Sequence, residues 1–280
     1  MESILFPTDF SEVSMNAFLY ALEYAKKMDA KIVVFHSFDL NVEAQPHIAE
    51  VYKELDIRNF RSKKKTFLPF EEIVAEKGLN EIKIKYVVRE GSFLETFTQY
   101  AAKREDKIDL VVMGTQLTKN SLFELFTESN TVKILDEINK PVIVVPSQAE
   151  FDGNLNNILF LVDYRDDEKE PLEDLTSQLK SFGAKLHVVH FDLAHGDSIV
   201  PLMDRFKASL KVHDFHNVAF KTIDSIDIKK SLLAYCTENE IDIVYLINHK
   251  RNFYQRLFTY SLAEDLIKNI NTPVMAIYRE

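Results

Sequence analysis

Short apolar runs alternate with longer amphipathic stretches along the chain. In its first part the apolar runs cover residues 3–7, 31–38, 82–88, 110–113 and 142–145. Each run is continuously apolar instead of alternating with polar positions, which is typical of strands in a parallel sheet that is covered on both faces. Runs of strand length separated by stretches of helix length predict successive β-α-β units, and hence an α/β fold.

The amphipathic stretches between these runs predict helices, which cover residues 11–28, 44–76, 92–105 and 129–139. Ser11 is suited to be the N-cap of the first helix, because its hydroxyl oxygen can accept a hydrogen bond from an N–H group of the first turn. Pro69 falls inside the second stretch. It should kink or end that helix, because proline has no N–H to donate and its ring clashes with the preceding turn.

The same order of segments occurs twice in the chain. Residues 4–9 (ILFPTD) return as residues 158–163 (ILFLVD), and residues 31–36 (KIVVFH) return as residues 185–190 (KLHVVH), at one common offset. Later segments return in the same order at a smaller offset, so the second copy is shorter in its middle. Repetition of a whole βαβ pattern indicates two copies of one domain.

We therefore predict two tandem Rossmann-like domains, residues 1–149 and 154–280, each a five-stranded parallel sheet flanked by helices. The polar segment that contains Gly153 fits a short linker between them. The fifth strands, residues 142–145 and 274–277, are apolar edge strands, and edge strands left open promote association. We expect these two strands to pair, so that the domains form an intramolecular pseudo-dimer.

Composition narrows the possible functions. The formal net charge of −10 argues against a general nucleic-acid-binding protein, since such proteins neutralise phosphates with an excess of Lys and Arg. The apolar runs are too short to cross a bilayer, so we expect no membrane partner. The single cysteine, Cys236, cannot form an intramolecular disulfide and is expected to be a small buried side chain. We expect a cytoplasmic location.

Three segments of the first copy carry a family resemblance. Residues 6–12 (FPTDFSE), 109–115 (DLVVMGT) and 139–146 (NKPVIVVP) resemble the universal stress protein family. The second copy resembles it more loosely, through Asp163 and through residues 241–246, 248–251 and 273–275. The order and duplication of these segments identify the chain as a tandem member of that family.

The resemblance implies a candidate nucleotide site in the first domain. Family members that bind ATP have an aspartate after the first strand and a glycine loop, G-x2-G-x9-G-[ST], for the phosphates. Asp9 and Gly114 match this pattern, and Ser129 and Asn130 stand where further donors would lie. ATP or AMP is the ligand that the first domain would accept, although we expect no tightly held cofactor.

The glycine loop of the first copy is degenerate. Leu117 and Glu128 stand where the family has its second and third glycines, and the loop is one residue longer. Leu117 hinders the close approach of backbone N–H groups to phosphate, and Glu128 adds a competing negative charge. In the second copy Ile247 or Asn248 replaces the first glycine. There Asp163 can serve simply as a strand-end cap, which is also the plain interpretation of Asp9.

The histidine residues and the known catalytic motifs give no evidence for a metal site or an enzyme active site. His187, His190 and His195 are spaced so that the first two point to opposite faces of a strand, and we expect no metal site. His36 and His190 occupy equivalent places in the two copies, which favours a shared structural role. The sequence contains no nucleophile elbow, P-loop or metalloprotease motif, so we assign no catalytic residues and expect no enzyme activity.

Two functions remain open. The first is a non-catalytic stress-response or signalling protein, with degenerate nucleotide sites and an unidentified protein partner. A homodimer of the whole chain is a further expectation. The alternative is an adenine-nucleotide sensor or slow ATPase that acts through Asp9, Gly114, Ser129 and Asn130 of the first domain.

Overall fold

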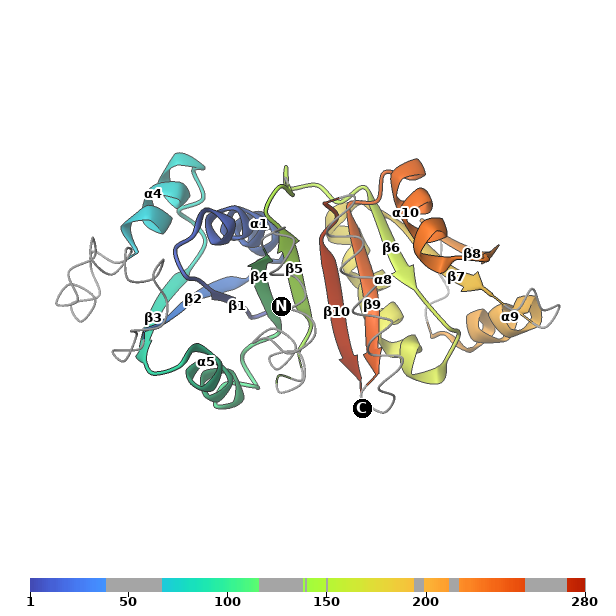
Figure 1. Cartoon of the computed structure of the whole chain (residues 1–280), viewed down its shortest axis with the longest axis horizontal. Helices are drawn as coiled ribbons and strands as arrows, with labels where there is room; N and C mark the ends of the chain where they lie inside the picture. Colours follow the sequence, from blue (N-terminus) through green and yellow to red (C-terminus); the bar gives the residue numbers. More distant parts are fainter. Residues whose placement is uncertain are drawn as a thin grey trace.

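The computed structural model describes residues 1–38, 67–115, 138, 140–149, 151–193, 199–211, 217–249 and 271–279. Within these residues, ten strands form one continuous sheet in the order β3-β2-β1-β4-β5-β10-β9-β6-β7-β8 (Figure 1). Neighbouring strands run parallel except at β5 and β10, which are antiparallel. We call β1 to β5 with their helices the N-terminal half, and β6 to β10 with theirs the C-terminal half.

The strands of the N-terminal half are β1 (Ser3–Pro7), β2 (Lys31–Phe38), β3 (Ile84–Glu90), β4 (Leu110–Thr115) and β5 (Val142–Pro146). Its described helices are α1 (Glu12–Met28), α4 (Leu68–Glu76) and α5 (Phe93–Ala102). The expected strands are all present, although β3 begins two residues later than predicted. Helix α1 begins as expected, because the Ser11 hydroxyl accepts a hydrogen bond from the Ser14 N–H at 3.2 Å.

The helical stretch predicted over residues 44–76 is interrupted next to Pro69, as expected. Phe67 is not helical and α4 begins at Leu68, which places Pro69 in the first turn of that helix. The first-turn N–H groups of a helix have no partner within the helix, so proline is tolerated there without loss of a hydrogen bond. The predicted helical residues 44–66 lie outside the described residues, as does nearly all of the predicted helix over residues 129–139.

The strands of the C-terminal half are β6 (Asn157–Leu161), β7 (Lys185–Asp192), β8 (Val218–Asp224), β9 (Ile243–His249) and β10 (Val274–Arg279). Its helices are the 3-10 helix η2 (Asp166–Glu168), α8 (Lys169–Phe182), α9 (Ile199–Ser209) and α10 (Ile228–Glu238). Helices cover both faces of the parallel strands, so the α/β fold class with flanked parallel sheets is confirmed. The domain limits at residues 149 and 154 stay a prediction.

Strand register recurs between the halves. In β1 and β2, Ile4 lies opposite Ile32, and in β6 and β7 the equivalent Ile158 lies opposite Leu186. In β1 and β4, Leu5 lies opposite Val111, as Leu159 lies opposite Val244 in β6 and β9. Each residue near the end of a strand therefore has a definite counterpart in the other half.

The two halves meet at a seam formed by β5 and β10. Val144 lies opposite Val274 and Ile143 opposite Met275, and these side chains are buried. The arrows of β5 and β10 point in opposite directions at the centre of Figure 1. Aromatic rings pack above the seam, where Tyr24 of α1 lies 5.4 Å from Phe182 of α8 between ring centroids. The seam is thus an apolar core shared by both halves.

Candidate functional site

The order of strands indicates where a ligand site belongs in each half. In the N-terminal half, β2 and β3 lie on one side of β1, while β4 and β5 lie on the other. Ligands of open parallel sheets bind outside the carboxyl ends of the strands at such a switch in strand order. Asp9 directly follows β1, and Gly114 lies near the end of the adjacent β4. The topology therefore brings these two predicted site residues to one edge.

Asp9 closes the turn between β1 and α1. Its Oδ1 accepts hydrogen bonds from the Ser11 N–H at 3.0 Å and from the Ser11 hydroxyl at 2.6 Å. The hydroxyl of Thr8 accepts the Phe10 N–H at 2.9 Å. The Asp9 side chain remains exposed, so a ligand can reach it, but one of its oxygens already stabilises the start of the helix.

Phe10 shapes the inner side of this turn. It has a φ of 63°, in the left-handed region that few non-glycine residues adopt. This conformation places its ring 4.7 Å from the ring of His36 and 5.7 Å from that of Phe70, between centroids. His36 is buried, and its Nδ1 lies 2.7 Å from the carbonyl oxygen of Thr8. Burial lowers the pKa of His36, which favours the neutral ring.

The C-terminal half repeats this aromatic arrangement. Tyr164 has a φ of 59°, and its ring lies 5.4 Å from that of His190 and 5.5 Å from that of Phe206, between centroids. The Nδ1 of His190 lies 2.8 Å from the carbonyl oxygen of Val162. The shared structural role predicted for His36 and His190 is therefore confirmed: each ring fixes the backbone at the end of a first strand.

Gly114 has a packing role. A Cβ atom at this position would lie 2.8 Å from the carbonyl oxygen of Val13 and 3.1 Å from the Cβ of Ala17, both in α1. Glycine is therefore required for α1 to approach β4 this closely. The resemblance assigned Gly114 to phosphate binding, and the geometry provides a sufficient reason for the glycine without any ligand.

The counterpart of Gly114 is a large apolar residue. Because Val111 and Val244 are equivalent by register, Gly114 corresponds to Ile247, which is buried with 7% of its surface exposed. The C-terminal half therefore does not present glycine at this point of β9. The predicted donors Ser129 and Asn130 lie outside the described residues, as do Leu117 and Glu128.

Glu168 is the feature of the C-terminal half that sequence analysis missed. The residue is 2% exposed, and its carboxylate accepts the Asp163 N–H at 3.0 Å on each oxygen and the Arg165 N–H at 2.9 Å on Oε2. Burial raises the pKa of Glu168 to about 7, although the hydrogen bonds from these two amides act in the opposite direction. An internal carboxylate thus occupies the turn that follows β6.

The Asp163 side chain does not cap the turn after β6 in the way that Asp9 caps the turn after β1. In the N-terminal half Asp9 accepts from the Ser11 N–H, whereas Glu168 accepts from the equivalent Arg165 N–H. Asp163 is exposed, with an oxygen 3.5 Å from the Arg165 guanidinium and another 3.6 Å from His190 Nδ1. The expectation that Asp163 is a strand-end cap is therefore wrong, since Glu168 performs that function.

Two further titratable side chains of the C-terminal half, His187 and Cys236, are buried in the core. The Nδ1 of His187 lies 2.7 Å from the Tyr235 hydroxyl, and burial lowers the pKa of His187 to about 4. Cys236 is buried as expected, which raises its pKa to about 12.

Within the described ranges, no three metal-ligating side chains gather in a way that could hold an ion. Among the helices described, none is long and apolar enough to cross a membrane.

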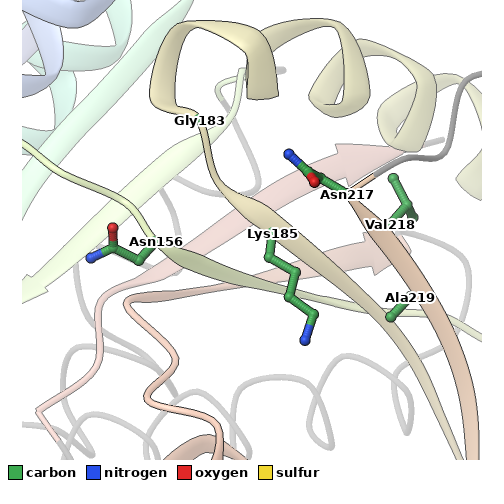
Figure 2. A pocket seen from close by; sticks show the side chains of 6 residues that line it. All are labelled: Asn156, Gly183, Lys185, Asn217, Val218 and Ala219. Atoms are coloured by element: carbon green, nitrogen blue, oxygen red, sulfur yellow. The ribbon is translucent and has the colours of Figure 1, made fainter.

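An open pocket of about 290 Å³ lies away from the candidate site (Figure 2). Its lining residues are Asn156, Gly183, Lys185, Asn217, Val218 and Ala219. They surround the amino ends of β6, β7 and β8, whereas ligands of such sheets bind beyond the carboxyl ends. Figure 2 shows the amide of Asn156 and the ammonium group of Lys185 pointing in different directions. The pocket therefore offers no converging set of polar groups.

Comparison with known proteins gives concordant results. A model of the universal stress protein family matches residues 1–146. A universal stress protein of Methanocaldococcus jannaschii is 28% identical over 151 residues, which cover 51% of this chain and 81% of the relative.

Solved structures extend the likeness to the whole chain. A universal stress protein of Archaeoglobus fulgidus matches with a TM-score of 0.70 at 18% identity, covering 99% of this chain and 98% of its own. This match shows a common fold. A universal stress protein solved in complex with cAMP matches 44% of this chain and 97% of its own, at 15% identity and a TM-score of 0.34.

Proposed function

Because this chain belongs to the universal stress protein family, we propose that it is a non-catalytic stress-response or signalling protein built as an intramolecular pseudo-dimer. In this proposal the two halves are tandem domains whose nucleotide sites have degenerated to different degrees. The cytoplasmic location, the unidentified protein partner and a homodimer of the whole chain stay predictions.

The seam between β5 and β10 is the observation that carries the proposal. Two halves with recurring register are joined there by an antiparallel ladder, with Val144 opposite Val274 at its centre. Pairing of two equivalent strands in opposite directions is the geometry of a two-fold dimer interface. Burial of both strands removes the edges that would otherwise promote association with other chains.

The strand-end turns support degeneration of the sites. Glu168 occupies the turn of the C-terminal half with a negative charge, and Ile247 replaces the glycine of β4. In the N-terminal half, one oxygen of Asp9 already holds Ser11, and Gly114 is required by packing. Among the described residues of the two turns, no serine, threonine or cysteine is paired with a histidine base in the way that nucleophilic catalysis requires.

A second function has one observation in its favour. Asp9 is exposed at the switch between β1 and β4, where a ligand of an open parallel sheet would lie. The alternative is therefore an adenine-nucleotide sensor, or a slow ATPase, confined to the N-terminal half. Asp9 and Gly114 would form its described part, with Ser129 and Asn130 supplying further donors.

Calorimetry with ATP or AMP and magnesium distinguishes the two functions. Three proteins are compared: wild type, Asp9→Asn and the matched control Asp163→Asn. We expect weak or undetectable binding by wild type and phosphate release no faster than in buffer. Tight binding at one site per chain, lost in Asp9→Asn and retained in Asp163→Asn, would support the sensor. Phosphate release that depends on Asp9 would support the ATPase.

The pseudo-dimer can be tested in the full chain by inserting a protease site beside Gly153, between β5 and β6. After cleavage we expect the two halves to elute together on a sizing column, because the seam remains buried. Separation of the halves into independent monomers at micromolar concentration would contradict the proposed interface.

A further inference from the structure

A cavity of about 370 Å³ lies where the connection between the two halves passes beside α1. It is lined by residues 149, 151–152 and 154–156 of that connection, by residues 241–242 and 271–273, which precede β9 and β10, and by Tyr20 of α1. A cavity of this volume can hold a small organic molecule. Because the connection between β5 and β6 occurs once in the chain, we expect one such site per chain.

Two polar atoms at this cavity are buried and have no hydrogen-bond partner among the described residues. They are the hydroxyl oxygen of Tyr20 and the Oδ1 of Asn271. Tyr20 is 2% exposed. The amide nitrogen of Asn271 donates to Gln148 Oε1 at 3.2 Å, which leaves Oδ1 as the unused end of that amide. A buried polar group without a partner costs free energy, so a ligand that completes its hydrogen bonding is favoured.

The Tyr20 hydroxyl lies close to the carboxylate of Asp242, which also lines the cavity. Burial raises the pKa of Tyr20 well above its usual value, and the nearby Tyr24 and Asp242 raise it further. The Oδ2 of Asp242 accepts the N–H groups of Asn156 and Asn157, at 2.6 and 2.8 Å, which hold the carboxylate in place. No described residue donates to its Oδ1, so this oxygen is a further unused acceptor.

The charge at the cavity is negative. Asp152 and Asp242 line it, and the described lining residues include no lysine, arginine or histidine. Glu23 of α1 lies nearby, with its Oε2 2.9 Å from the position that a Cβ of Gly153 would occupy. Unused acceptors beside carboxylates are suited to a cation that only donates hydrogen bonds. An ammonium group, which has three N–H donors and no acceptor, is such a cation.

An aromatic pair gives the cavity an apolar wall. The rings of Tyr20 and Phe151 are stacked, with 4.4 Å between centroids and an interplanar angle of 28°. Leu155 and Pro273 add further apolar surface. Because the face of an aromatic ring attracts cations and also packs well against hydrocarbon, this wall is compatible with both parts of an alkylammonium ion.

We propose that this cavity is a binding site for a small aliphatic amine, whose ammonium group donates to Asp242 Oδ1, the Tyr20 hydroxyl oxygen and Asn271 Oδ1. The hydrocarbon chain of the amine packs on Phe151. In a diamine, the second ammonium group faces solvent beside the exposed Asp152. The site is separate from both strand-end turns and does not depend on nucleotide binding, so it goes beyond the proposed function.

Calorimetry on the full chain at pH 7.5 tests the site, with 1,4-diaminobutane as the probe. We expect one site per chain, with an affinity that falls as the salt concentration rises, because salt screens the attraction between partly exposed charges. Two molecules with the same number of carbons serve as controls. Neither 1,4-butanediol, which is neutral, nor succinate, which has the opposite charge, should bind detectably.

The variant Asp242→Asn removes the central negative charge. It should weaken diamine binding by about 10-fold or more, because a charge-assisted hydrogen bond is lost. The matched control is Asp109→Asn in the N-terminal half. Asp109 Oδ2 accepts the N–H groups of Glu2 and Ser3 at the start of β1, as Asp242 does at the start of β6, but it does not line the cavity. Asp109→Asn should therefore bind the diamine as wild type does.

The variant Tyr20→Phe keeps the aromatic ring and removes only the hydroxyl group. It should weaken diamine binding by about 3- to 10-fold, and its thermal stability should be at least that of wild type, because a buried hydroxyl without a partner is removed.

Three results would overturn the proposal. The first is no heat from 1,4-diaminobutane at millimolar concentration, and the second is equal binding of the diol and the diamine. The third is wild-type affinity in both Asp242→Asn and Tyr20→Phe. Equal weakening in Asp109→Asn and Asp242→Asn would also contradict it, because the loss of binding would then come from a general effect on the fold.

Discussion

The two strand-end turns have nearly the same backbone and different side chains. Phe10 and Tyr164 both adopt a left-handed conformation, and each ring packs on a histidine that holds the preceding strand. In the N-terminal half an exposed aspartate, Asp9, closes the turn, whereas in the C-terminal half the buried Glu168 closes it. The aromatic and histidine framework therefore fixes the backbone, and the acid that closes the turn can be changed without altering the fold.

Gly114 and its counterpart Ile247 also differ in side chain while the surrounding fold stays the same. Gly114 lets α1 approach β4, while Ile247 fills the corresponding place in β9 with a side chain. Helix α1 begins at Glu12, whereas the equivalent α8 begins later, after the 3-10 helix η2. One half thus uses helix backbone and the other a side chain to cover its fourth strand.

Substitutions of Gly114 and Ile247 should have the largest effect on stability. Gly114→Ile would drive a branched side chain into the backbone of α1, and we expect a loss of more than about 3 kcal/mol in unfolding free energy. Ile247→Ala should cost about 3 kcal/mol, because it leaves a cavity. Urea denaturation followed by circular dichroism measures both. Wild-type stability in Gly114→Ile would show that the glycine is not required for packing.

A histidine found in one half only should make stability depend on pH. His187 corresponds to Val33 by register, and its pKa is lowered to about 4 by burial. The unfolded state takes up a proton on His187 at a higher pH than the folded state does. The unfolding free energy is therefore highest above the unfolded-state pKa of about 6.5 and decreases as the pH falls towards 4. Between pH 7 and pH 5 we expect this residue to reduce the unfolding free energy by about 2 kcal/mol.

The matched variant His187→Val should lack this part of the pH dependence. It will also be less stable at pH 7, because the Tyr235 hydroxyl loses its partner, so the slope with pH is the informative quantity. Equal slopes in wild type and variant would mean that another group causes the acid sensitivity.

The smallest effect should come from the two aspartates. Asp9→Ala removes two hydrogen bonds to Ser11 and should reduce the unfolding free energy by about 1 kcal/mol. Asp163→Ala removes exposed contacts with Arg165 and His190 and should cost less than about 0.5 kcal/mol. Thermal unfolding of the pair at pH 7.5 measures the difference. A larger loss of unfolding free energy for Asp163→Ala than for Asp9→Ala would mean that Asp163, and not Glu168, caps the C-terminal turn.

Sequence alone predicts most of the described fold. Strands β1 and β2 have the predicted bounds, because continuous apolar runs bounded by Pro7 and by polar residues mark buried parallel strands. The error at β3 has a simple cause. Ile82 is buried and apolar, but its N–H bonds to the Leu79 carbonyl oxygen in a turn, so apolar character there reflects core packing before the strand begins.

The candidate site is less predictable than the fold. Asp9 could be identified because an acid directly follows a strand, and its edge follows from the parallel topology. Glu168 could not, since three acidic residues in succession, 166–168, are typical of a solvated helix start. Its burial depends on the left-handed turn at Tyr164, and such a conformation of a non-glycine residue leaves no sequence signal.

The antiparallel seam determines how the two strand-end turns can communicate. Because the strand direction reverses between β5 and β10, the carboxyl ends of β1 and β6 open at opposite margins of the ten-stranded sheet. One small molecule cannot bridge them. The two turns are therefore connected only through the core that the halves share, which includes the ladder of Val142, Ile143 and Val144 and the packing of Tyr24 on Phe182.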